Sequence, residues 1–206
     1  MKYLQLLIWL ALFAQLAANA QENSKNRTLY EMHMLQDRIE KDAAFMNPDE
    51  SPLPKDMISN FKGLDYFPVD KKYRVKAKLE LTGDTTIIKI PTNTDRTPKY
   101  RRYAVATFTL DENTLQLTLF QNVRLENNPD YQNYLFLPFN DMTNGVETYG
   151  GGRYLDLKSK SKDSVIIDFN QAYNPYCAYN PNYSCPIPPD ENNLKIQIRA
   201  GVKAFD

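Results

Sequence analysis

Apolar and charged residues alternate through the middle of the chain, and this alternation is the main guide to the fold. Between Tyr73 and Leu81 every second residue is apolar and the residues between them are charged, a pattern that predicts a strand with one buried face. Gly83 and Asp84 are typical of a turn, so Thr85–Ile90 is predicted to return as the second strand of a hairpin. The sequence predicts further strands at Tyr100–Leu110, Thr114–Val123, Tyr134–Phe139, Arg153–Leu157, Ser164–Phe169 and Leu194–Arg199.

Helical periodicity is confined to the start of the mature chain. Apolar residues recur three or four positions apart from Met32 to Ala43, and Thr28 stands three residues before Glu31, as in a capping box. These signals predict a helix over Leu29–Ala44, which the prolines after Asn47 must end. A short helical turn is expected within Pro54–Phe61.

Many short strands with few helices between them indicate a mainly β fold, α+β by content. We expect an antiparallel β-sandwich or an open barrel, with the N-terminal helix packed against it. No repeat or low-complexity linker divides the chain. Residues 21–206 are therefore predicted to form a single domain.

The first twenty residues have the pattern of a signal peptide. Lys2 precedes an apolar run from Leu6 to Ala14, and Ala18 and Ala20 are the small residues that a signal peptidase accepts. We expect cleavage after Ala20 and export to the periplasm or the medium. A retained membrane anchor is the alternative, but the run is shorter than the about 20 apolar residues that a spanning helix needs. No transmembrane segment is expected after cleavage.

The charge balance excludes several classes of partner. The chain has 25 basic and 25 acidic residues, and the signal peptide contains one basic residue and no acidic one, so the mature net charge is about −1. Such a neutral chain lacks the basic surface that binds nucleic acid or anionic membranes. No nucleic-acid partner and no cofactor are expected.

A set of ordered phrases resembles one protein family. The phrases are Ser51–Leu53, Phe61–Pro68, Tyr73–Val75, Thr118–Phe120, Leu135–Phe139, Glu147–Asp156, Asp168–Tyr179, Cys185–Pro186, Pro188–Leu194 and Ile198–Gly201. They resemble a bacterial family known as domain of unknown function 1684, and the resemblance covers roughly Leu35 to Lys203. One departure is Val202, where members tend to have glutamate. The resemblance implies no activity, cofactor or partner.

Both cysteines lie in the densest part of this resemblance. Cys177 and Cys185 are the two thiols of a chain that we expect to be exported, so a disulfide closing a short loop is predicted. A reactive thiolate or a metal pair is the alternative. Zinc prefers four ligands and the chain has a single histidine, His33, on the predicted helix, so no metal site is expected.

Glycines and charged residues precede the cysteines. Gly150–Gly152 are interpreted as a turn or bulge that needs positive φ, because no helix with Lys-Ser or Lys-Thr follows them as in a phosphate loop. Glu147 and Asp168 are candidate acid and base groups and Arg153 a candidate anion clamp. A structural ion-pair network is the alternative. Alternation places Arg153 and Asp156 on opposite faces of their strand.

The following segment is rich in amides and phenols. Asn170, Tyr173 and Asn174 belong to this segment, and such side chains suit neutral, hydroxyl-rich ligands. The alternative is an irregular loop whose asparagines bond its own backbone. The candidate ligand-binding residues are therefore Glu147, Arg153, Asp168, Asn170, Tyr173 and Asn174.

Three functions remain open from the sequence. The first is an exported β-domain that binds a small polar ligand or an envelope partner through its C-terminal region. The second is a carboxylate-based hydrolase that uses Glu147 or Asp168 with Arg153 as the clamp. The third is a structural envelope protein without a ligand.

Overall fold

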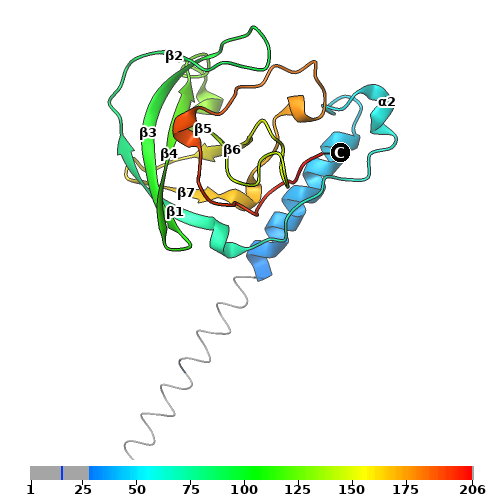
Figure 1. Cartoon of the computed structure of the whole chain (residues 1–206), viewed down its shortest axis with the longest axis horizontal. Helices are drawn as coiled ribbons and strands as arrows, with labels where there is room; N and C mark the ends of the chain where they lie inside the picture. The colour runs from blue at the N-terminus through cyan, green and yellow to red at the C-terminus, as the bar shows by residue number, and fades with distance from the viewer. Residues whose placement is uncertain (1–14, 16–27, 206) are drawn as a thin grey trace, which may run out of the picture. The chain divides into compact units, whose positions relative to one another are not determined.

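The computed structural model describes residue 15 and residues 28–205 (Figure 1). Nearly all of the predicted signal peptide, residues 1–20, lies outside the described residues. The chain divides into two compact units, residues 1–41 and residues 42–206. A helix occupies residues 28–46, close to the predicted Leu29–Ala44.

The second unit is built mainly of strands. It contains one short helix, α2 (Lys55–Ile58), within the predicted Pro54–Phe61. The strands are β1 (Arg74–Leu81), β2 (Ile88–Lys89), β3 (Lys99–Leu110), β4 (Asn113–Asn122), β5 (Tyr134–Phe139), β6 (Arg153–Lys158) and β7 (Ser164–Asp168). Single 3₁₀ turns are η1 (Lys71–Tyr73), η2 (Pro129–Tyr131), η3 (Phe169–Gln171), η4 (Tyr176–Ala178) and η5 (Asp190–Asn192).

All strands belong to one antiparallel sheet with the order β6-β5-β4-β3-β1-β7, and β2 pairs with β3. The two ends of this order, β6 and β7, are consecutive in the chain and are joined by residues 159–163. The sheet therefore curls into a half-barrel, as Figure 1 shows. The predicted mainly β, antiparallel fold class is confirmed, in the form of an open barrel.

Alternation along the strands builds the main core. In β1, Val75, Ala77 and Leu79 are buried while the charged residues between them are exposed. The corresponding inward residues of the other strands join them, together with Leu194 and Ile198 of the C-terminal segment. This segment, orange to red in Figure 1, lies across the curled sheet.

The opposite face of the sheet is also covered along part of its width. The outward residues Tyr100, Phe120, Phe136 and Tyr154 form a second buried cluster, the outer cluster, with Ile90 and Cys185. Tyr173 pairs with Tyr154 through both backbone groups, and Pro186 pairs with Thr92. The segment from Tyr173 to Pro186 thus covers this part of the sheet.

The predicted hairpin of β1 with Thr85–Ile90 is wrong. Only Ile88–Lys89 is strand, and Ile88 lies opposite Tyr100 of β3. β1 pairs with β3 along one edge and with β7 along the other. Because both edges are occupied, the returning chain has no free edge of β1 to join.

The predicted strand Leu194–Arg199 is also wrong, although its alternation does mark buried positions. Leu194 and Ile198 are buried, but side chains supply part of the hydrogen bonding of this backbone. The amide of Ile198 donates to the Asp141 carboxylate at 3.1 Å, and its carbonyl accepts from Arg153 at 2.8 Å. Its other backbone bonds go to the chain that follows β5, from the Leu194 amide to the Asn140 carbonyl and from the Met142 amide to the Ile196 carbonyl, and the segment joins no strand ladder.

Gly150–Gly152 form a turn as predicted, and Gly152 is the one of the three with a positive φ. Its φ is +89°, and a Cβ there would lie 2.5 Å from Pro188 and 2.6 Å from Asn140. The residue closes the turn that leads into β6. Glycine is required at this position for both backbone conformation and space.

Pro138 creates an opening between β4 and β5 that Asn192 fills. The single register pair, Phe120 with Phe136, would place Thr118 opposite Pro138, which has no N–H to donate. The Asn192 side chain instead accepts from the Thr118 amide at 2.7 Å and donates to the carbonyls of Thr118 and Pro138 at 2.9 and 2.7 Å. Asn192 is fully buried and replaces the missing strand pairing.

Replacing Asn192 with alanine is expected to destabilise the protein by about 3 kcal/mol or more, because three buried backbone groups lose their partners. Urea unfolding of the purified protein measures this loss. Asn182→Ala is the matched control, since Asn182 is exposed, and it should stay within about 0.5 kcal/mol of the parent. Equal midpoints for the two variants would contradict the bridging role.

Candidate functional site

Arg153 lies in the interior. Its side chain is fully buried, and its guanidinium faces the Phe139 ring at 5.3 Å from the ring centre. Nη2 donates to Asp141 at 2.7 Å and to the Ile198 carbonyl at 2.8 Å. Nη1 donates to the carbonyls of Ala200 and Val202. The candidate anion clamp is thus surrounded by the protein's own acceptors.

Asp141 completes this buried ion pair. Its second carboxylate oxygen accepts from the amide and hydroxyl of Thr143 at 2.8 and 2.6 Å and from the Ile198 amide at 3.1 Å. Burial lowers the pKa of Arg153, while the Asp141 charge acts in the opposite direction. Burial of charge is tolerated here because both Asp141 oxygens and both terminal nitrogens of Arg153 are hydrogen-bonded, although Arg153 Nε has no partner among the described residues.

Asp168 and Asn170 hold two turns together. Asp168 accepts from the Asn170 amide at 3.1 Å and lies 3.6 Å from the Arg74 guanidinium. The Asn170 side chain bonds both backbone groups of Asp70, at 2.9 and 2.8 Å. These contacts connect η3 to Asp70, the residue that caps η1.

Glu147 and Asn174 are placed near the chain's end. Glu147 pairs with Arg199 at 2.9 Å on the surface, and its carbonyl accepts from the Ala204 amide. Asn174 is buried and donates to the Lys203 carbonyl at 2.9 Å. Glu147, Arg153 and Asp168 each have their own charged partner, so the structure does not assemble them around one cavity.

Tyr173 interacts with a different carboxylate, that of Asp156. The pKa of Tyr173 is raised, first by burial and then by the charge of Asp156 and a hydrogen bond to it. Asp156 is exposed on β6, whereas Arg153 on the same strand is buried. The predicted opposition of Arg153 and Asp156 is therefore confirmed.

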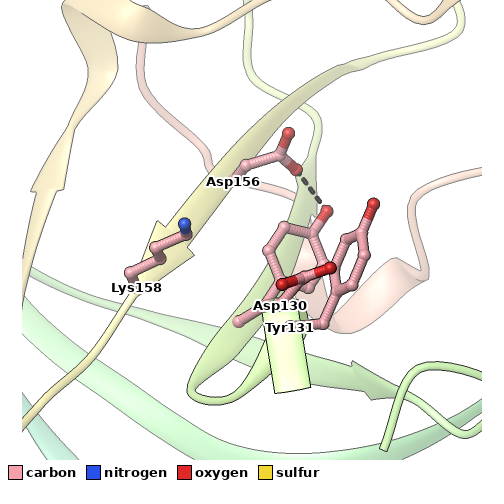
Figure 2. Close-up of a pocket in the computed structure, with 5 residues that line it drawn as sticks. Asp130, Tyr131, Asp156 and Lys158 are labelled. Atoms are coloured by element: carbon pink, nitrogen blue, oxygen red, sulfur yellow. Dashed lines mark hydrogen bonds between the residues drawn. The ribbon is translucent and has the colours of Figure 1, made fainter. Parts of the chain in front are cut away.

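Asp156 lines a pocket of about 560 Å³ with Asp130, Tyr131, Tyr134 and Lys158 (Figure 2). Asp156 and Lys158 project from β6, opposite Phe136 and Tyr134 of β5. Asp130 and Tyr131 belong to η2, whose first turn is capped by Asn128. The pocket combines two carboxylates, one ammonium group and two phenol rings.

Tyr134 and Asp156 form the closest polar contact in the pocket. The Tyr134 hydroxyl donates to the Asp156 carboxylate at 2.6 Å, the dashed line in Figure 2. Burial and the neighbouring negative charge raise the pKa of Tyr134, so its hydroxyl remains a donor at neutral pH. Tyr131 packs edge-on to Tyr134 at 5.4 Å and remains 40% exposed.

Cys185 belongs to the outer cluster, Cys177 packs against it, and both are free thiols. The Cys177 amide donates to the Cys185 sulfur at 3.2 Å. Within the described residues, no group of three or more His, Cys, Asp or Glu side chains is arranged to hold a metal ion. Nor does any helix in this part of the chain have the length and apolar character to cross a membrane.

The fold and these contacts describe a half-barrel domain with a phenol-lined acidic pocket on its outer face. Residues 59–203 match the family described as a protein of unknown function, DUF1684, and the chain belongs to that family. This confirms the family resemblance of the sequence.

A solved structure shares the fold. It is the solution NMR structure of the uncharacterised protein from gene locus rrnAC0354 of Haloarcula marismortui. The two sequences are 34% identical, the TM-score is 0.66, and the match covers 87% of this chain and 96% of that one. Comparison with curated proteins finds no match.

Sequence reasoning identified Tyr173 but did not name the pocket. The sequence places Asp156 on the strand face opposite Arg153, and Tyr134 comes from the neighbouring strand through a register that the sequence does not reveal. Asp141, the partner of Arg153, had one local signal. It stands two residues before Thr143 and accepts a hydrogen bond from the Thr143 amide, as in an Asx turn.

The buried ion pair of Arg153 and Asp141 predicts that loss of the Asp141 charge destabilises the protein far more than loss of the Glu147 charge. Asp141→Asn removes the charge that balances buried Arg153 and should cost about 3 to 5 kcal/mol. Glu147→Gln, at the exposed pair with Arg199, should cost less than about 1 kcal/mol. Urea denaturation compares the two variants under the same conditions. A small, equal effect of both substitutions would refute the distinction.

Proposed function

We propose that this domain binds a small, neutral, hydroxyl-rich ligand in the pocket of Asp130, Tyr131, Tyr134, Asp156 and Lys158. The observation that carries the proposal is the exposed Asp156 carboxylate, which two phenols orient toward a cavity of about 560 Å³. Ligand pockets typically measure about 300 to 1,000 Å³ and contain few polar groups in fixed positions.

The partners of Asp156 distinguish it from the other carboxylates of the candidate region. Asp141 and Asp168 accept from backbone amides and pair with arginine. Asp156 accepts from the Tyr134 phenol, and a carboxylate has about four lone-pair positions. Acceptor capacity therefore remains for hydroxyl groups of a ligand in the pocket.

The aromatic and charged neighbours support the same ligand class. The exposed ring of Tyr131 offers an apolar surface on which the C–H face of a polyol packs. Asp130 and Lys158 add an acceptor and a donor. Tyr173 contributes from the covering segment by its hydrogen bond to Asp156.

The remaining candidate residues suit architectural roles within this proposal. Arg153 with Asp141 secures the C-terminal segment, and Asn170 and Asn174 bond the backbone at Asp70 and Lys203. We include only Tyr173 of the original candidates in the ligand site.

We further propose that the protein is exported after cleavage behind Ala20 and that Cys177 and Cys185 then form a disulfide. The n-region, apolar run and small residues of the first twenty positions support export. The proximity of the two sulfurs, with the Cys177 amide 3.2 Å from the Cys185 sulfur, supports the pairing.

Ligand binding is tested with a panel of monosaccharides, polyols and small metabolites by thermal shift, followed by calorimetric titration of each compound that raises the melting temperature. Asp156→Asn should weaken binding by about tenfold or more, because a hydrogen bond to a charged acceptor is lost. Tyr131→Ala should weaken it by about tenfold through loss of the ring face.

Asp163→Asn is the matched control, since Asp163 is exposed in the loop between β6 and β7, outside the pocket. It should bind as the parent does. Melting of each variant without ligand checks that the fold is intact. Unaltered affinity of Asp156→Asn, or no response of the parent to any compound, would reject the proposed function.

Export predicts a mature N-terminus at Gln21. Expression of the full chain in a bacterium, fractionation and mass spectrometry of the intact protein measure the cleavage position. Ala20→Arg should block processing, because the peptidase needs a small residue before the cut. Recovery of the uncut chain from the membrane fraction would instead indicate a retained anchor.

A further inference from the structure

Cys177 and Cys185 meet in an asymmetric environment. Cys177 lies on the short turn η4 and is partly exposed, whereas Cys185 is only 8% exposed within the outer cluster. The Cys177 amide donates to the Cys185 sulfur at 3.2 Å. The Tyr149 hydroxyl lies 3.8 Å from the Cys177 sulfur. One thiol is therefore accessible and the other is enclosed.

The backbone of Cys185 is fixed to the segment that follows β2. Its amide donates to the Asn93 side chain at 2.7 Å, and its carbonyl accepts from the Asn93 amide at 3.3 Å. The next residue, Pro186, forms the bridge with Thr92. Cys177 lies instead in the 3₁₀ turn η4.

The hydrogen bonds around the sulfurs favour ionisation of Cys177. Its pKa is lowered to about 7, chiefly by the hydrogen bond from the Cys185 thiol and also by that from Tyr149. Burial and the contact with Cys177 raise the pKa of Tyr149 to about 12, so the phenol stays protonated and donates. The pKa of Cys185 is raised by its bond to Cys177 and by burial.

We propose that Cys177 and Cys185 form a thiol–disulfide exchange site in which Cys177 attacks first and Cys185 resolves the mixed disulfide. The substrate class is a small disulfide, such as oxidised glutathione. The inference rests on the pairing of the two cysteines proposed above and is independent of the ligand pocket.

The reaction balances in two steps. The Cys177 thiolate attacks one sulfur of the disulfide, forms a mixed disulfide and expels the other half as a thiolate. Cys185 then gives its proton to solvent and attacks the Cys177 sulfur, which releases the second half as a thiolate. The protein dithiol is oxidised to a disulfide, and the small disulfide is reduced to two thiols.

The test uses the mature protein, fully reduced, and the chromogenic aryl disulfide 5,5′-dithiobis(2-nitrobenzoate). The parent should release two equivalents of the coloured thiolate and end with an internal disulfide. Cys185→Ser keeps a hydroxyl donor beside Cys177 and should release one equivalent and retain a stable mixed disulfide. Intact mass and peptide mapping identify each product.

The rates assign the order of attack. At pH 7, Cys177→Ser should react at least about fivefold more slowly than Cys185→Ser, because a smaller thiolate fraction outweighs the greater nucleophilicity of the more basic thiol. The rate of Cys185→Ser should rise as pH increases through about 7, where the Cys177 thiol ionises. Cys185→Ala removes the donor and should shift this rise toward higher pH.

Two results would overturn the assignment. Equal rates for Cys177→Ser and Cys185→Ser would contradict the proposal that Cys177 attacks before Cys185. Retention of two mixed disulfides by the parent would eliminate Cys185 as the resolving thiol and the proposed disulfide with it. Neither result bears on ligand binding, which the Asp156→Asn variant tests separately.

Discussion

The buried ion pair of Arg153 and Asp141 fixes the C-terminal segment, which joins no strand ladder. Arg153 is the first residue of β6, and its guanidinium reaches the carbonyls of Ile198, Ala200 and Val202. The C-terminal segment is thereby held against the sheet, although it forms no ladder with it. Removing two charges from water is costly, and the hydrogen bonds of the two terminal Arg153 nitrogens and the two Asp141 oxygens offset this cost.

Amide side chains likewise hydrogen-bond backbone groups at other places where strand pairing is interrupted. Asn192 replaces the strand pairing that Pro138 prevents, and Asn170 and Asn174 bond the backbone at Asp70 and Lys203. An amide carries both donor and acceptor, so it can substitute for a neighbouring peptide group. The abundance of asparagine in this region thus has an architectural explanation, while Asp156 and Lys158 on the outward face of β6 line the pocket.

The alternation of residues predicted most of the sheet because each half-buried strand needs only its local pattern. Tyr134–Phe139 is a strand with the predicted bounds. The hairpin failed because pairing depends on which edge of β1 is free, and distant strands decide that. The strand prediction for Leu194–Arg199 is wrong because side chains such as Asp141 supply part of its backbone hydrogen bonding. The pocket likewise depends on the β5–β6 register, which brings Tyr134 beside Asp156.

The pairing of Tyr154 with Tyr173 has a consequence for solubility. The backbone groups of Tyr154 turn away from Pro138 and bond both groups of Tyr173, so the covering segment blocks the outer edge of β6. An unblocked edge strand is a template for pairing with another molecule. If this segment detaches, the edge of β6 becomes free to pair with another molecule. The Tyr173 phenol then also moves away from Asp156. Protection against aggregation and assembly of the pocket therefore depend on the same few residues.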